Sequence, residues 1–156
     1  MDRFMLMIKV GYPSREEERK VMDRMTGTTS ARANPTSSPE QLLEAGRVVR
    51  DIYVDDRVKD YIVDVVFATR EPKAKGMEEL GPLIEYGASP RASIALNLAA
   101  RAHAFLRHRG YVTPDDVKAV GPDVLRHRVV LSYEAEAEEV TAEDIVRRVF
   151  EVVEVP

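Results

Sequence analysis

Apolar residues recur every three or four positions over much of the chain, and that spacing places them on one face of a helix. The clearest stripe follows Ser89-Pro90 and stops before Gly110, a residue type that commonly ends helices. Its apolar positions are Ile94, Ala95, Leu98, Ala99, Ala102, Phe105 and Leu106. A second stripe opens at Asp55 or Asp56 and continues to Thr69. The pattern therefore predicts a mainly α protein, a bundle of about five to seven helices.

Helix-start signals divide the rest of the chain. A Ser or Thr cap with an acid or amide three residues later marks a helix start, and Pro is favoured at the first helical position. These signals predict further helices over residues 15–25, 39–53, 114–120, 122–125 and 142–149. Gly121-Pro122 is expected to separate two of them, because proline removes a hydrogen bond from a helix.

Polar and turn-forming residues mark the connections. Residues 27–38 form a polar linker of about the longest kind that a compact domain tolerates. Residues 71–88 form a loop, with a short helical turn around residues 77–80. Residues 129–133 are expected to be extended and residues 134–139 to form an acidic connector.

Residues 4–12, FMLMIKVGY, have a different pattern. This compact apolar run alternates in its second half and stops at Gly11 and Pro13, which predicts a β-strand. No second strand is predicted near it in the sequence. A strand without a partner indicates that this segment belongs to something larger.

Composition places the chain among soluble globular proteins. Of its 156 residues, 44% are hydrophobic and 32% charged, and the formal net charge is −4. The apolar runs are far shorter than the roughly 20 residues of a membrane span. No export signal is found, so we expect a cytoplasmic protein. The absence of cysteine excludes disulfides, thiolate zinc sites and cysteine nucleophiles.

Complete catalytic motifs are missing from the sequence. It contains no G-x-x-x-x-G-K-[ST], G-x-G-x-x-G, H-E-x-x-H or G-x-S-x-G, so it has no self-sufficient site of those kinds. His103 and His108 lie five residues apart and therefore on different faces of a helix. Solvated histidines are favoured over metal ligands, and no metal site is expected.

The segment Gly87-Ala88-Ser89-Pro90-Arg91-Ala92-Ser93 carries the strongest hint of chemistry. With Ser89 as the cap and Pro90 first, Arg91 falls in the first helical turn, where the helix dipole disfavours a cation by ~0.3–1 kcal/mol. An anion bound at this helix start, most often phosphate, would explain such a cation. The alternative is a surface ion pair with Glu85 or Asp116, which the residues alone favour.

Charge is unevenly distributed along the sequence. Residues 89–113 carry four arginines and no acid, whereas residues 134–154 carry eight acids and two arginines. We expect the two segments to neutralise each other, within one fold or between subunits. A nucleic-acid groove is less favoured, because the pI is near 5.5 and aromatic residues do not alternate with the arginines.

A set of short motifs resembles the MoxR family of AAA+ ATPases over essentially the whole chain. The motifs are Asp2-Arg3-Phe4 before a run ending Gly11-Tyr12-Pro13, Val54-Asp55-Asp56, Ala68-Thr69-Arg70, Tyr86-GASPRAS, Gly110-Tyr111-Val112-Thr113-Pro114-Asp115-Asp116-Val117 and Val124-Leu125-Arg126-His127-Arg128. The match is to the C-terminal part of the family, and magnesium chelatase ATPase subunits carry a similar lid. The resemblance implies that residues 1–13 are the last strand of the ATPase core and that residues 14–156 form a helical lid domain. His108 departs from it, because glycine is common there.

The resemblance also implies roles for individual residues. Arg91 matches the sensor-two arginine, which reaches ATP from the start of the lid helix, where Ser89 and Pro90 lie. Arg3 matches an arginine finger that acts on a neighbouring subunit's nucleotide. ATP with Mg²⁺ is the implied ligand of the full-length protein. This fragment lacks the phosphate loop, so it should bind ATP weakly at most and should not hydrolyse it.

The implied partners are the ATPase core of the same polypeptide and the neighbouring subunits of a homo-oligomeric ring. Family members resemble chaperones that act on other proteins, among them proteins with von Willebrand factor A domains. Residues 27–38 and 71–87 are the places where a partner is expected to bind. Two alternatives stay open: a free-standing helical protein-interaction module without a nucleotide role, and a nucleic-acid-binding lid that uses the arginine-rich helix.

Overall fold

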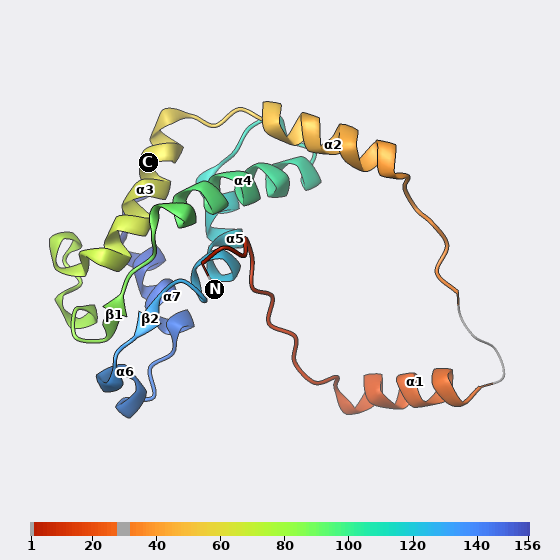
Figure 1. Ribbon diagram of the computed structural model, residues 1–156, viewed down its shortest axis with the longest axis horizontal. Coiled ribbons are helices and arrows are strands. Elements are labelled where there is room, and N and C mark those ends of the chain that lie inside the picture. Colours follow the sequence, from red (N-terminus) through yellow and green to blue (C-terminus); the bar gives the residue numbers. More distant parts are fainter. Residues whose placement is uncertain (1, 28–31) are drawn as a thin grey trace.

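The computed structural model describes residues 2–27 and 32–156, and it is mainly helical as predicted (Figure 1). The described residues form seven α-helices, two short 3₁₀ helices and two short strands. The α-helices are α1 (Arg15–Thr26), α2 (Pro39–Asp51), α3 (Asp56–Arg70), α4 (Pro90–Leu106), α5 (Pro114–Leu125), α6 (Tyr133–Ala137) and α7 (Ala142–Val152). The 3₁₀ helices are η1 (Pro72–Lys75) and η2 (Glu78–Leu80), and the strands are β1 (Ile84–Tyr86) and β2 (Val130–Leu131).

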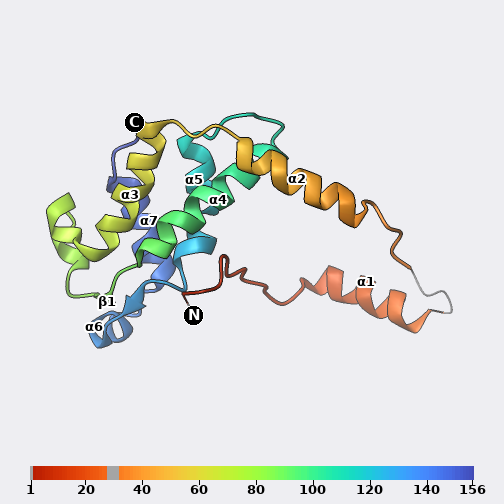
Figure 2. The same cartoon turned by 45° about the horizontal axis from the view of Figure 1, so that its top comes forward.

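The core lies among α3, α4, α5 and α7. Every buried apolar side chain of the described residues falls between Ile52 and Val153. In contrast, α1 and α2 bury no residue, and both views show them reaching away from the helical body as an arm (Figures 1 and 2). Only the C-terminal end of α2 approaches the body, beside α4. The helical body is therefore the part of the chain that folds around a shared core.

Three of the predicted helix starts are confirmed by capping boxes. Complete capping boxes open α1 at Ser14, α2 at Ser38 and α7 at Thr141. Each satisfies two backbone N–H groups that have no partner inside the helix. The turn predicted near residues 77–80 is present as η2, and β2 lies within the segment expected to be extended. The predicted linker over residues 27–38 falls partly outside the described residues.

Two expectations about the helices of the helical body are wrong. First, α5 continues through Pro122 instead of restarting there. The ring of Phe150, on α7, lies so close that a Cβ on Gly121 would come within 2.3 Å of it. We attribute the unbroken helix to this packing, which offsets the lost hydrogen bond. Second, the expected acidic connector contains α6, because Ala135 is fully buried and Ser132 caps the helix.

The strand predicted over Phe4–Tyr12 is not formed. Residues 6–14 have no regular secondary structure, and the Met7 N–H donates to the Asp123 carbonyl, which lies in a helix, at 2.8 Å. A strand requires a neighbouring strand to complete its hydrogen-bond ladder, and this segment has none among the described residues. The two strands that do form, β1 and β2, pair with each other as an antiparallel ladder. Of these, β1 lies in the segment predicted to be a loop.

The backbone conformation at the end of α4 explains why glycine is common at the position of His108. His108 has a φ of 56°, in the left-handed region, and its N–H donates to the Phe105 carbonyl at 2.9 Å. The next amide, of Arg109, donates to the Ala104 carbonyl at 3.0 Å. This pair of bonds is a Schellman motif, in which glycine is the usual residue at the left-handed position.

None of the described helices is long and apolar enough to span a membrane.

Candidate functional site

The start of α4 is built as the sequence predicts. Ser89 is the cap, and its hydroxyl accepts a hydrogen bond from the Arg91 N–H at 3.2 Å. Pro90 is the first helical residue. The preceding residue is fixed to α3, because the Ala88 N–H donates to the buried hydroxyl of Thr69 at 2.9 Å. The position of Arg91 is therefore set by contacts between α3 and the loop before α4.

Gly87 lies against the backbone of α3, and replacing it should disturb this anchor. A Cβ at Gly87 would lie 2.3 Å from the Thr69 carbonyl oxygen, a backbone atom that cannot rotate away. We expect Gly87→Ala to lower the free energy of unfolding by about 1–3 kcal/mol. Urea denaturation measures this effect. Gly46→Ala is the control, because Gly46 lies in α2 with open space around it. It should leave stability unchanged or raise it by up to about 1 kcal/mol, and equal losses in the two variants would contradict the prediction.

Arg91 pairs with an acid that the sequence analysis did not propose. Its Nη1 atom lies 3.5 Å from Oδ2 of Asp2, and its side chain remains 59% exposed. The same carboxylate oxygen accepts a hydrogen bond from the Ser89 hydroxyl at 2.8 Å. The acids proposed from sequence, Glu85 and Asp116, do not pair with Arg91. The N-terminal turn of the chain is therefore folded against the start of α4.

Arg3 and Arg91 face one pocket. This pocket has a volume of about 290 Å³, and its charged lining consists of Arg3, Arg91, Arg128 and Asp2. Apolar side chains of α4 and of the N-terminal turn complete the lining. Ser89 and Pro90 do not line it, although the Ser89 hydroxyl binds Asp2 at its edge. The structure thus brings together two arginines that lie far apart in the sequence.

The electrostatics of this pocket favour an anion. Three guanidinium groups surround one carboxylate, which leaves an excess of positive charge. Partial burial alone would raise the pKa of Asp2, but hydrogen bonds from Ser89 and Arg128 and the charges of Arg128 and Arg91 lower it. Arginine binds phosphate oxygens through paired, charge-assisted hydrogen bonds. A multiply charged oxyanion therefore suits this site.

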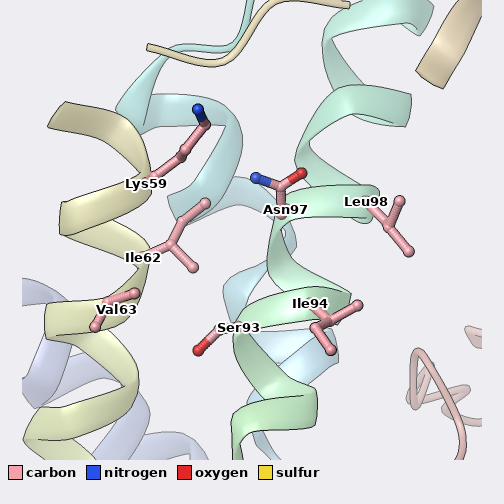
Figure 3. A pocket seen from close by; sticks show the side chains of 7 residues that line it. All are labelled: Lys59, Ile62, Val63, Ser93, Ile94, Asn97 and Leu98. Atoms are coloured by element: carbon pink, nitrogen blue, oxygen red, sulfur yellow. The ribbon is translucent and has the colours of Figure 1, made fainter. Parts of the chain in front are cut away.

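A second groove, between α3 and α4, has no cluster of arginines (Figure 3). Its volume is about 320 Å³, and its lining is Lys59, Ile62, Val63, Ser93, Ile94, Asn97 and Leu98. The labelled side chains show one amine, one hydroxyl and one amide dispersed among apolar groups (Figure 3). Ile94 and Leu98 also line the arginine pocket, so these two side chains form the ridge between the grooves.

Sequence reasoning missed Arg128, which is buried beneath the N-terminal turn. The sequence assigns it no role beyond its place in the motif Val124-Leu125-Arg126-His127-Arg128. The available signal was its place between the apolar residues Val124, Leu125 and Val129, where a solvated arginine is unusual. His127 likewise contacts the N-terminal turn, through its Nε2 atom and the Phe4 carbonyl at 3.0 Å.

A second group of charged side chains lies away from the arginine pocket. His103 and Arg109 both contact the buried carboxylate of Asp116. None of the four arginines over residues 89–113 forms an ion pair with an acid of residues 134–154 among the described residues, so these segments do not neutralise each other directly. Among the described residues, no group of three or more His, Asp or Glu side chains is placed so that it could hold a metal ion.

Comparisons with known proteins agree with this architecture. The family described as "AAA lid domain" matches residues 80–149. Chaperone MoxR1 of Mycobacterium tuberculosis is 46% identical over 155 residues, which cover 99% of this chain and 41% of that protein. Protein MoxR of Methylorubrum extorquens is 34% identical over 72% of this chain and 34% of its own length.

A solved structure supports the same conclusion in three dimensions. The crystal structure of a Cytophaga hutchinsonii protein matches with a TM-score of 0.94 and 37% sequence identity, covering 99% of this chain and 47% of that one. This coverage includes the arm and the N-terminal turn as well as the helical body. The chain spans less than half the length of these relatives. It belongs to the MoxR family of AAA+ ATPases and corresponds to the lid portion of such a protein.

Proposed function

We propose that this chain is the lid of an ATP-hydrolysing MoxR protein and that the arginine pocket receives phosphate groups of ATP. One observation carries the proposal: Arg3 and Arg91, from distant parts of the sequence, face the same positively charged pocket. Guanidinium groups placed in this way stabilise the charge that develops on a transferring phosphoryl group. The apolar ridge of Ile94 and Leu98 would shield that charge from water.

The shared pocket also bears on which nucleotide each arginine contacts. The family resemblance implies that Arg91 acts on its own subunit's ATP and Arg3 on a neighbour's. Because both side chains line one pocket of one chain, we propose instead that they contact the same nucleotide. In a ring, that nucleotide would be held by the core of an adjacent subunit, with the lid covering it.

The rest of the machinery is proposed to lie in the ATPase core outside this sequence. The core would hold ATP and Mg²⁺, and the lid would supply the arginines and would not bind nucleotide tightly by itself. Loss of the γ-phosphate would then release the lid from the nucleotide and let it move relative to the core that holds this nucleotide. Since one relative bears the name chaperone, we propose chaperone-like action on partner proteins, including proteins with von Willebrand factor A domains, in the cytoplasm.

Replacing Arg91 in the full-length protein tests the proposal. Arg91→Ala should lower kcat for ATP hydrolysis by about 10–100-fold, because one of two phosphate-facing guanidinium groups is lost. Steady-state phosphate release measures this change. Arg107→Ala is the matched control: Arg107 caps the opposite end of α4 and does not line the pocket. Turnover that is unchanged in Arg91→Ala would contradict the proposal.

An interaction module without a nucleotide role is the second candidate. The exposed apolar side chains of the arm favour it, since Val21, Met22, Leu42 and Leu43 face solvent in this structure. This candidate predicts wild-type turnover in Arg91→Ala together with loss of partner binding when the arm is altered. A nucleic-acid-binding lid would instead show affinity that falls steeply with salt.

A further inference from the structure

Arg128 is fully engaged beneath the N-terminal turn. It lies between α5 and β2, and its side chain is only 2% exposed. Its Nε atom donates to Oδ1 of Asp2 at 3.1 Å, and its Nη1 atom donates to the Met5 carbonyl at 3.1 Å and to the Val124 carbonyl. A buried guanidinium with this many acceptors is held in one orientation.

The acceptors of Arg128 lie on both sides of Arg3. Its Nη2 atom donates to the carbonyl of Asp2 at 3.3 Å and to the carbonyl of Phe4, the residues directly before and after Arg3. The side chain of Arg3 itself is exposed and has no ion-pair partner within the described parts of the chain. Arg128 therefore fixes the backbone that carries Arg3 and leaves the Arg3 guanidinium free to contact a ligand.

Asp2 connects Arg128 to the other arginine of the pocket. Its Oδ1 atom is bound by Arg128, while its Oδ2 atom accepts from the Ser89 hydroxyl at 2.8 Å and lies 3.5 Å from Arg91. One carboxylate thus joins the buried arginine, the cap of α4 and the exposed arginine. An anion that binds Arg91 must share or replace the contact with Asp2.

We propose that Arg128 is a positioning residue of the phosphate pocket, because it holds the turn of residues 2–5 so that Arg3 and Arg91 face one ligand. This inference rests on the proposed function. Asp2 contacts both Arg91 and Arg128, so a ligand that binds Arg91 also affects the turn that carries Arg3. Arg128 contributes to turnover through Arg3 and does not contact phosphate in this role.

A double-substitution cycle in the full-length protein tests this positioning role. Arg128→Lys keeps the charge but loses the planar fork that binds the carbonyls beside Arg3. We expect it to lower kcat for ATP hydrolysis by about 10-fold or more. Because Arg128 acts through Arg3, the double variant should fall to the level of Arg3→Ala alone, so Arg3→Ala added to Arg128→Lys should lower kcat by about 100-fold or less and not by its full effect of about 10³-fold.

Arg101→Lys is the matched control. Arg101 also donates to backbone carbonyls, those of Arg50 and Ile52, but away from the pocket. In that background Arg3→Ala should keep its full effect on kcat. If Arg3→Ala lowers turnover by the same factor in the Arg128→Lys protein, Arg128 is merely structural and this inference is overturned. If Arg3→Ala alone has no effect, the proposed function fails and this inference fails with it.

Hydrogen exchange gives a readout that does not depend on activity. The Met7 amide, bonded to the Asp123 carbonyl, should exchange about 10-fold faster in Arg128→Lys, while core amides of α4 keep their protection. Unchanged Met7 exchange would overturn the inference. Should Arg128→Lys unfold the lid, Asp2→Asn serves as the second variant, since Asp2 is half-buried and outside the core. It must show the same non-additivity with Arg3→Ala.

Discussion

Arg3→Ala in the full-length protein is expected to lower kcat for ATP hydrolysis by about 10³-fold, within the range known for arginine fingers. Arg3 faces the pocket that also holds Arg91, and its guanidinium has no ion-pair partner among the described residues. Its charge is therefore available for the transferring phosphoryl group. Phosphate release at saturating ATP measures the loss. Arg15→Ala is the control, because Arg15 begins α1 in the exposed arm.

Mixing two impaired variants distinguishes the two arrangements of the arginines. In a ring made from equal amounts of Arg3→Ala and Arg91→Ala subunits, a nucleotide that meets both arginines of one chain never finds an intact pair. A nucleotide that takes Arg91 from its own subunit and Arg3 from the next would find an intact pair at about a quarter of the sites. The shared pocket predicts no recovery of turnover. Recovery to about a quarter of the wild-type rate would instead support the roles that the family resemblance implies, with Arg91 acting on its own subunit's ATP and Arg3 on a neighbour's.

Local signals in the sequence were sufficient to place Arg91 but not its partner. Ser89 and Pro90 define the helix start through neighbouring residues, so the first turn of α4 could be predicted. Asp2 and Arg128 meet across 126 positions of sequence, and no local pattern reports such a contact. The sequence offers an ion pair and an anion site as alternatives for Arg91. The structure combines them, because Arg91 pairs with Asp2 and also lines the pocket.

The errors in predicted secondary structure come from contacts of the same long-range kind. An apolar run such as residues 4–12 becomes a strand only beside another strand, and the described residues offer none. Pro122 was expected to break a helix, yet Phe150 of α7 packs against the adjacent Gly121. Propensity in both segments was overridden by what lies next to them in space.

Asp116 forms a second buried charge cluster, which connects the end of α4 to the start of α5. Its side chain is 1% exposed and accepts hydrogen bonds from His103 at 2.6 Å, from Arg109 at 2.8 Å and from the Thr113 amide at 2.8 Å. The sequence predicts it only as an alternative ion-pair partner of Arg91 and as part of the motif that runs from Gly110 to Val117. In the structure it is the acceptor that holds these donors together.

Asp116→Asn is expected to lower the free energy of unfolding by about 3–5 kcal/mol. Asparagine preserves the size of the side chain but removes the charge that balances Arg109, and its amide group cannot accept from all of these donors. Urea denaturation at neutral pH measures the change. Asp115→Asn is the matched control, since Asp115 is the exposed neighbour in the same helical turn. It should change stability by less than about 0.5 kcal/mol.

The acid dependence of stability tests the physical cause of that loss. Burial alone would raise the pKa of Asp116, but hydrogen bonds from Arg109, Thr113 and His103 outweigh it and hold the pKa far below its ordinary value of 3.8. A carboxyl with a lowered folded-state pKa contributes stability above its unfolded pKa and loses it as the pH falls toward the folded value. The stability difference between wild type and Asp116→Asn should therefore be constant near neutral pH and shrink as the pH falls below about 4. A difference that stays constant down to about pH 2 would show that the loss arises from packing and not from the carboxylate charge.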